Sequence, residues 1–327
     1  MKRFQTVLYL LCLVCILLNI SGCLGATSKH IVFADQNRTV SLVAGLSKSE
    51  IGIVLNEREF LLCESNGEVL CQKNFESRIL SLDMRGRFCL FAFDDKHIEL
   101  YLYTDGELTN VCDHSFDSDI TKIELAEGGS GADDDIVIVL LRNGDLWRSK
   151  SGIEKDIFVL MSDHVKTAVY EDFWRSVIYI KDDGNINAWS INKESIPSEI
   201  ENEVLLNVTE LENSYYDSMP CVLARDDKYC YYIRIGDDLN LSMIDQVLAN
   251  EITPVYAADT IPNSVLTFEN GRYYYEGVSQ SERKEYRRHG KHGERVLVDI
   301  PHGYSICTIK GGVVCYNDHE VWVVLVN

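Results

Sequence analysis

Several residues of this sequence belong to types that bind metals or carry out catalysis, but their spacing matches no specific site. His289 and His292 lie three residues apart in the charged stretch 281–295, and His302 follows them. A zinc site needs further ligands and supporting hydrogen bonds, so this stretch predicts a solvated loop instead. The consecutive acids Asp133–Asp135 lack the alternating ligand spacing of a calcium-binding loop.

The serine of GGSG (128–131) is not spaced as a catalytic nucleophile, because a nucleophile elbow requires Gly-x-Ser-x-Gly after a strand. We therefore predict that the chain is not an enzyme and uses neither a cofactor nor a metal. A hydrolase with a site in a central pocket is one alternative. It would need a pair of carboxylates at a set separation, and a sequence does not show that distance.

Cys23 has the clearest chemistry in the sequence. Lys2 and Arg3 precede the mostly apolar stretch 4–20, and the sequence Ile-Ser-Gly-Cys then ends at Cys23. These four residues resemble the bacterial lipobox, which implies diacylglycerol attachment at the cysteine. The apolar stretch is short for a membrane span, so a cleaved signal peptide is favoured over a retained anchor or an ordinary signal.

The expected organisation follows from this motif. Residues 1–22 are predicted to be a helical signal peptide that is removed, 23–29 a short tether, and 30–327 the folded domain. Membrane lipid would hold the mature chain through Cys23 on the extracytoplasmic face of a bacterial membrane or envelope. Cleavage removes Lys2 and Arg3 and no acid, so the net charge changes from −20 to −22. Such an acidic chain repels phosphates, so no nucleic-acid partner is expected.

The elements that must position any site are short strands joined by tight turns. In SVIYIKDDGNINAWS (176–190), an alternating apolar run breaks at Asp183-Gly184 and then resumes, which predicts a hairpin. Related turns recur along the chain at intervals of about 42 residues, a period typical of propeller blades. The turns are at Glu57, Asp95, Gly144, Gly184, Lys228, Gly271 and Gly312.

Each repeat has room for four strands. In the second repeat these would be ILSLDM, FCLFAF, IELYLYT and ELTNVC, within 79–112. A single such sheet cannot bury both of its faces, but sheets arranged around an axis cover one another. The sequence therefore predicts an all-β, seven-bladed propeller of four-stranded antiparallel blades. Six or eight blades, or a pair of sandwiches, are the alternatives.

The third to seventh repeats resemble the regulator-of-chromosome-condensation repeat. In 165–190, Ser176, Asp183-Gly184 and Trp189 follow one another in the order of that family. Ser264 and Ser305 each stand seven residues before a turn glycine, as the family pattern requires. The resemblance implies a propeller. The first two repeats are more similar to quinoprotein blades, which leaves an assembly scaffold as a further alternative.

Aromatic residues in the predicted loops are the remaining candidates for a site. The loops between the first and second strands of the blades should emerge at one end of the propeller, where aromatic side chains would form a recognition surface. The alternative is that the rings pack beneath neighbouring blades. We expect an unknown protein or glycan partner there, bound by Tyr170, Asp172, Phe173, Trp174, Tyr215, Tyr216, Asp217 and Tyr304.

Two further expectations concern the chain ends and the cysteines. A strand at 30–34 or at 39–43 should pair beside 321–326 and close the ring, because a lone apolar edge invites aggregation. Of the 11 cysteines, eight lie beyond Cys23. Three pairs straddle predicted turns, which allows disulfides, although free buried thiols are equally consistent. These pairs are Cys63/Cys71, Cys221/Cys230 and Cys307/Cys315.

Overall fold

The computed structural model describes most of the chain beyond the predicted signal peptide. The described residues are 27–45, 49–126, 135–150, 156–171, 174–190, 198–200, 203–216, 219–235, 241–248, 255–257, 264–269, 272–277, 295–300, 302–309 and 312–326. Within them the chain consists of β-strands, turns and one 3-10 helix, η3 (Glu203–Asn207). Residues 1–22 and Cys23 lie outside the described residues, so the predicted signal helix and lipid anchor stay predictions.

The described strands form seven four-stranded sheets, and all paired strands are antiparallel. The first sheet contains β2 (Val40–Gly45), β3 (Glu50–Leu55), β4 (Glu59–Glu64) and β5 (Val69–Asn74). The second contains β6 (Ile79–Arg85), β7 (Phe88–Phe93), β8 (His97–Thr104) and β9 (Glu107–Ser115). The third contains β10 (Ile120–Ala126), β11 (Ile136–Leu141), β12 (Leu146–Ser149) and β13 (Phe158–Ser162).

The later sheets repeat this order. The fourth contains β14 (Val165–Glu171), β15 (Ser176–Lys181), β16 (Ile186–Ser190) and β17 (Ser198–Ile200). The fifth contains β18 (Glu210–Tyr216), β19 (Met219–Arg225), β20 (Tyr229–Ile235) and β21 (Leu241–Leu248). The sixth contains β22 (Val255–Ala257), β23 (Ser264–Glu269), β24 (Arg272–Gly277) and β25 (Arg295–Val298). The last contains β26 (Ser305–Ile309), β27 (Gly312–Tyr316), β28 (Glu320–Val326) and β1 (Thr27–Ala34).

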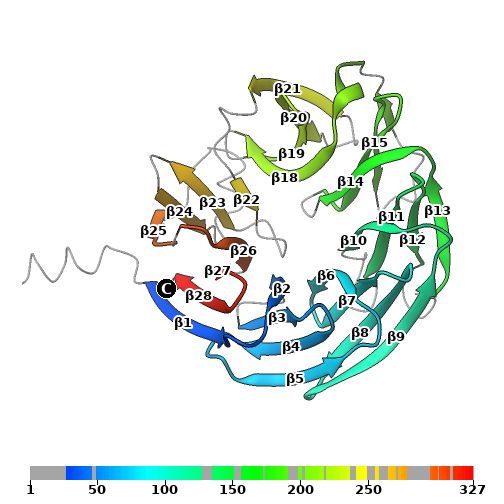
Figure 1. Cartoon of the computed structure of the whole chain (residues 1–327). Helices are drawn as coiled ribbons and strands as arrows, with labels where there is room; N and C mark the ends of the chain where they lie inside the picture. The colour runs from blue at the N-terminus through cyan, green and yellow to red at the C-terminus, as the bar shows by residue number, and fades with distance from the viewer. Residues whose placement is uncertain are drawn as a thin grey trace, which may run out of the picture.

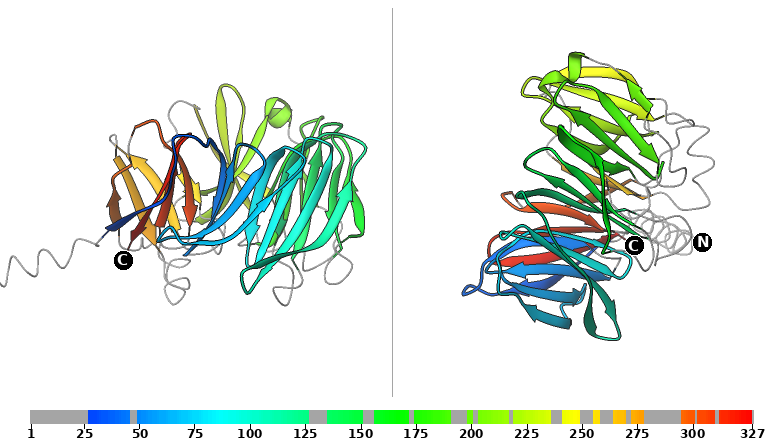
Figure 2. Two further views of the ribbon diagram at one scale, coloured as in Figure 1. Left: turned by 60° about the horizontal axis from the view of Figure 1, so that its bottom comes forward. Right: turned by 90° about the vertical axis from the view of Figure 1, so that its right-hand side faces the viewer.

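The sheets stand around a central axis, with β2, β6, β10, β14, β18, β22 and β26 innermost (Figure 1). This is the arrangement of a β-propeller, and it confirms the all-β fold predicted from the repeats. The four strands predicted for the second repeat correspond to β6, β7, β8 and β9 of one sheet. Figure 2 shows the ring from two further sides.

The two ends of the chain close the ring. In the last sheet β1 pairs with β28, and Thr27 stands opposite Val326. This confirms the closure predicted for 30–34 and 321–326, and it rules out the alternative at 39–43, which belongs to β2 of the first sheet. β1 begins three residues before the predicted domain boundary, so Thr27 to Lys29 are strand rather than tether.

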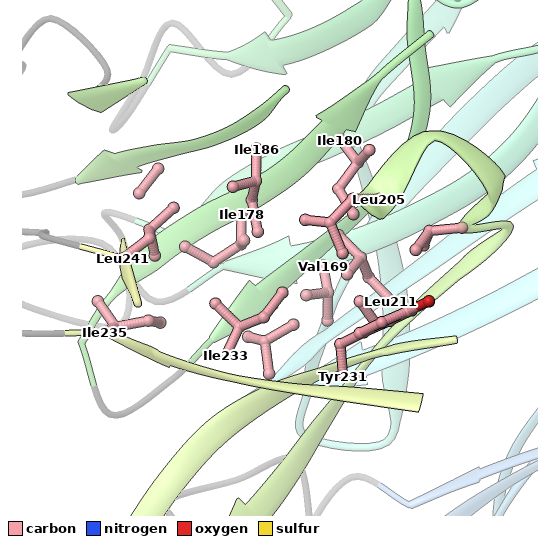
Figure 3. Close-up of a cluster of buried hydrophobic side chains, with 14 residues drawn as sticks. Val169, Ile178, Ile180, Ile186, Leu205, Leu211, Tyr231, Ile233, Ile235 and Leu241 are labelled. Carbon is pink, nitrogen blue, oxygen red and sulfur yellow. The ribbon is translucent and has the colours of Figure 1, made fainter. Parts of the chain in front are cut away.

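The core lies between adjacent sheets. Two of the second strands, β7 (FCLFAF) and β11 (IVIVLL), are buried along their whole length because neighbouring sheets cover both of their faces. Figure 3 shows one such interface, where Val169 and Ile178 of the fourth sheet pack with Tyr231 and Ile233 of the fifth. Equivalent clusters of buried side chains join other neighbouring sheets.

The repeated turns are the hairpins between the second and third strands. Glu57, Lys96, Gly144 and Gly184 have φ of 60°, 69°, 89° and 85°, the left-handed backbone that such turns require. The prediction was wrong for the last sheet. The turn at Gly312 joins the first strand to the second, and the equivalent of the other hairpins is at 317–319. The prediction chose this turn because of its pair of glycines. The hairpin between the second and third strands contains no glycine, and Asn317 forms it by accepting hydrogen bonds from His319 N and Glu320 N.

Candidate functional site

A cavity of about 450 Å³ lies on the axis of the ring. Its wall is formed mainly by the innermost strands β2, β6, β10, β14, β18 and β26. Strand alternation explains its lining, because every second side chain of an innermost strand points toward the axis. On β10 this rule places Lys122 and Glu124 on the same face, and both line the cavity.

The charged side chains of the cavity are mostly acidic. Asp83 of β6, Glu124 of β10, and Glu210 and Glu212 of β18 line it, whereas Lys122 is the basic residue in this lining. Lys122 Nζ lies 2.9 Å from Glu124 Oε1. The wall is therefore negative overall, in keeping with the acidic chain.

Three of these charged groups link the innermost strands of successive sheets. Leu125 N of β10 donates a 2.5 Å hydrogen bond to Asp83 Oδ2 of β6. Lys122 Nζ donates a 2.6 Å bond to Ala168 O of β14. Tyr170 N of β14 donates a 2.5 Å bond to Glu124 Oε2. Each bond satisfies a backbone group of β10 or β14, which are the inner edge strands of their sheets and pair with no further strand on the axial side.

The same linkage continues from the fourth sheet to the fifth. Leu211 N of β18 donates a 3.2 Å bond to Thr167 Oγ1 of β14, and Asn213 Nδ2 donates a 2.8 Å bond to Tyr170 O. Side chains thus join β6, β10, β14 and β18 in series. The geometry indicates that these polar residues tie the second to fifth sheets to one another around the axis.

Asp83 is an acid of this wall whose pKa departs from its ordinary value. Burial raises its pKa, and the nearby Glu124 adds to the effect. The backbone N–H groups of Leu125 and Met84 and the charge of Arg85 act in the opposite direction, but burial prevails. A carboxyl with a raised pKa can serve in acid–base chemistry, but here both oxygens accept backbone hydrogen bonds.

Among the residues that the structure describes, no group of three or more histidine, cysteine, aspartate or glutamate side chains could hold an ion. His289 and His292 are outside the described ranges, as are Asp133 and Asp134. Asp135 is buried at the start of β11.

Tyr170 does not lie on a loop surface as the sequence predicted. It is part of β14, is 4% exposed, and packs in the core between the third and fourth sheets. The Arg85 guanidinium carbon lies 5.3 Å from its ring centroid. Both residues line a smaller cavity of about 250 Å³ beside the axial one. The loop was predicted too long, because β14 continues to Glu171 before the chain turns.

Trp174 follows β14 and is partly buried. Its backbone N donates a 2.7 Å hydrogen bond to Glu171 Oε2, and its side chain packs against the core cluster of the fourth and fifth sheets. The indole side chain of Trp174 thus packs partly against the core and is partly exposed. Its predicted neighbours Asp172 and Phe173 lie outside the described residues.

The remaining predicted site residues are divided between the two ends of the ring. Tyr215 and Tyr216 belong to β18, opposite Pro220 and Met219, and Asp217 lies outside the described residues. Tyr304 was placed wrongly. It directly precedes β26, so it lies at the end where innermost strands begin, whereas Trp174, Tyr215 and Tyr216 lie where innermost strands finish. Its ring packs 4.6 Å from that of Trp322.

The sequence did not identify Asp83, Lys122, Glu124 or Asn213 as a group. One signal was available, since ITKIELA (120–126) alternates apolar residues with Lys122 and Glu124. That pattern indicates a strand with one polar face, but it does not show that the face lines an axis.

Comparison with known proteins supports the fold. No known protein family matches the sequence, and no curated protein does. Among solved structures, the Cps50 (Swd1) β-propeller domain of Myceliophteria thermophila matches with a TM-score of 0.58 and 12% identity, over 92% of this chain and 100% of that one. The N-terminal domain of Nup159 matches with a TM-score of 0.52 and 12% identity, over 91% and 95% of the two chains.

The chain is therefore a β-propeller, and at this level of identity the similarity concerns the fold alone. The regulator-of-chromosome-condensation resemblance is not among these matches and stays a prediction. Among the described residues, no helix has the length and apolar character needed to cross a bilayer.

Proposed function

We propose that this chain is a non-catalytic binding module that a lipid on Cys23 holds on the extracytoplasmic face of a bacterial membrane. The proposal rests on the structural role of the charged side chains that line the axial cavity. Asp83, Lys122 and Glu124 are bonded to backbone groups of neighbouring sheets, as structural ties would be. A ring held rigid in this way is suited to presenting surfaces to a partner.

The position of β1 supports an orientation for the anchored protein. Thr27 is four positions after Cys23, a distance of at most about 14 Å when extended. In the last sheet, Ser28 of β1 stands level with Leu325 of β28, with Gly312 of β27 and with Ile309, the last residue of the innermost strand β26. The anchor would therefore lie at the end of the ring where innermost strands finish, as the C-terminal end does in Figure 2.

Of the proposed partner-binding residues, Trp174, Tyr215 and Tyr216 lie at this same end. Asp172, Phe173 and Asp217 belong to the proposed set but lie outside the described residues, and Tyr170 and Tyr304 are left out of it. A protein or glycan that binds the residues of this set would itself lie at the membrane surface. The acids among them favour a partner that carries positive charge.

Membrane fractionation tests the anchor. Cys23→Ser should move the protein to the soluble fraction and abolish incorporation of a labelled fatty acid, whereas Cys15→Ala should change neither. Retention of Cys23→Ser in the membrane, together with no labelling of the wild type, would contradict the anchor.

Photo-crosslinking tests the binding face. A photoreactive amino acid is placed in exposed turns at the two ends of the ring, at Arg87 between β6 and β7, or at Asp183 between β15 and β16. In intact cells, crosslinks should form at Arg87 and be weakened by Tyr215→Ala or Trp174→Ala, with the fold checked by circular dichroism. Crosslinks at Asp183 alone would place the partner at the opposite end.

A further inference from the structure

The outer strand of the third sheet differs from the other outer strands. β13 ends the order β10, β11, β12, β13 and lies on the rim, at the right of Figure 1. In the described part of the chain, no strand pairs with its outer edge. An unpaired edge presents a row of backbone N–H and C=O groups that can pair with another chain.

β13 is the one outer strand of the described sheets without a charged residue. Its sequence is FVLMS. Charged side chains on an edge oppose pairing with other chains, and each other outer strand carries at least one. Those residues are Lys29 in β1, Lys73 in β5, Glu107 and Asp113 in β9, Glu199 in β17, Asp245 in β21 and Arg295 in β25.

The strand is also unusually apolar at its surface. Ile157, Val159 and Leu160 are 40%, 38% and 46% exposed. Val111 of β9 is similarly exposed, but Asn110 and Asp113 lie close to it in the same strand. Three exposed apolar side chains within four residues form a continuous apolar edge.

Packing on the inner side fixes the strand in place. The Phe158 ring lies 4.4 Å from that of His114 and 5.4 Å from that of Phe116, between the second and third sheets. Leu160 stands opposite Trp147 of β12. The edge is thus preformed, which lowers the entropic cost of adding a strand.

The ladder shows which backbone groups face outward. Lys150 N donates a 2.8 Å hydrogen bond to Ile157 O, so Ile157 is in a hydrogen-bonded pair with the inner strand. In an antiparallel ladder such pairs alternate with pairs that are not hydrogen-bonded. The N–H and C=O groups of Phe158 and Leu160 therefore point away from β12, toward the position that a fifth strand would take.

We infer that β13 binds an extended segment of another protein, whose apolar residues are flanked by lysine or arginine, as a fifth strand of the third sheet. The backbone groups of Phe158 and Leu160 would hydrogen-bond the segment, and the exposed apolar side chains would cover it. Exposed Asp156 and Asp163 bracket the strand and complement basic flanks. A second copy of this chain would bring the same acids and another net charge of −20.

The test uses a synthetic peptide, Lys-Lys-Val-Thr-Val-Ile-Val-Lys-Lys, and the full chain, with binding followed by fluorescence anisotropy. Leu160→Pro removes an outward N–H, and Val159→Lys places a positive charge on the edge. Each should raise the Kd tenfold or more. Val111→Lys, at a similarly exposed position of β9, should leave it within twofold. Amide exchange should slow at Phe158 and Leu160 when the peptide binds.

Three results would overturn the inference. They are no saturable binding to the wild type, equal binding to Leu160→Pro, and a wild-type dimer that Leu160→Pro converts to a monomer. The last result would assign the edge to a second copy. The inference is independent of the proposed anchor and of the loop face. Cys23→Ser should therefore bind the peptide as the wild type does.

Discussion

Lys122 Nζ on β10 donates a 2.6 Å hydrogen bond to the carbonyl oxygen of Ala168 on β14, 46 residues away in the sequence. The two residues lie on the innermost strands of adjacent sheets. The same ammonium group forms the ion pair with Glu124. One side chain therefore joins two sheets and offsets one of the acidic charges of the axial cavity.

Replacing Lys122 by methionine should destabilise the protein. The substitution leaves the Ala168 carbonyl and the Glu124 carboxylate without this partner, and a hydrogen bond to a charged group contributes about 1.5–3 kcal/mol. We expect a loss of that order in the free energy of unfolding, measured by denaturant titration. Arg142→Met is the control, because its ion pair with Asp119 is largely exposed and should contribute less than about 1 kcal/mol.

Removing 321–327 should unfold the whole domain. The deletion takes away nearly all of β28, and β1 then loses the strand with which it pairs. Val321 and Val323 are fully buried, so their loss also opens the core of the last sheet. Thermal unfolding followed by circular dichroism should lose its cooperative transition. Ile31→Ala, at an exposed position of β1, should keep it, and unchanged melting of the truncated chain would contradict closure.

The contribution of Asp83 to the free energy of unfolding should increase as the pH falls. Because burial raises its pKa in the folded state, the folded protein binds a proton that the unfolded chain does not hold at the same pH. The stability of the wild type relative to Asp83→Asn should therefore increase as the pH is lowered from 7 toward the ordinary carboxyl pKa. Denaturant titrations at several pH values measure this difference.

Asp35 provides a control for that experiment, because its pKa is shifted in the opposite direction. A hydrogen bond from Asn37 N and another from the Arg38 side chain lower its pKa. Its contribution is present above the unfolded pKa and is lost as the pH falls, so Asp35→Asn should show the reverse slope. The same slope for both variants would contradict the assignment for Asp83.

The cysteines should be free and slow to react in the folded protein. All eight that the structure describes are free, and burial raises the pKa of Cys63 to about 11 and of Cys221 and Cys315 to about 12. Alkylation by iodoacetamide at pH 8 should be at least about 100-fold slower for these three than in guanidinium, because the thiolate is the nucleophile. Half-buried Cys71 should react before them. Mass spectrometry that finds fewer than eight thiols after unfolding would indicate disulfides.

Much of the fold could be predicted because its signals are local. Asn143-Gly144 and Asp183-Gly184 specify tight turns through their own backbone preferences, and the alternation around them specifies strands. The second sheet was predicted strand by strand for this reason. The last hairpin was missed because Asn317 makes that turn through side-chain hydrogen bonds rather than through a glycine.

The candidate site could not be predicted in the same way. The sequence showed that Tyr170 and Tyr304 are aromatic and lie near strand ends, but the neighbouring sheets decide their exposure. Tyr170 is buried because β14 extends past it and Arg85 of the second sheet lies against its ring. Tyr304 lies at the other end because it precedes an innermost strand rather than following one.

By itself the sequence determined the strands, most turns and the repeat, since each depends on the residues within one repeat. It narrowed the closing partner of 321–326 to 30–34 or 39–43, because an apolar edge must be covered. Only the tertiary structure decided that Asp83, Lys122 and Glu124 face one axis and bind backbone groups of the next sheet. It also decided that β13 is the uncharged strand left at the rim. The hydrogen bonds of the three axial side chains join residues more than 40 positions apart, and they form only when the separate sheets stand side by side around the axis.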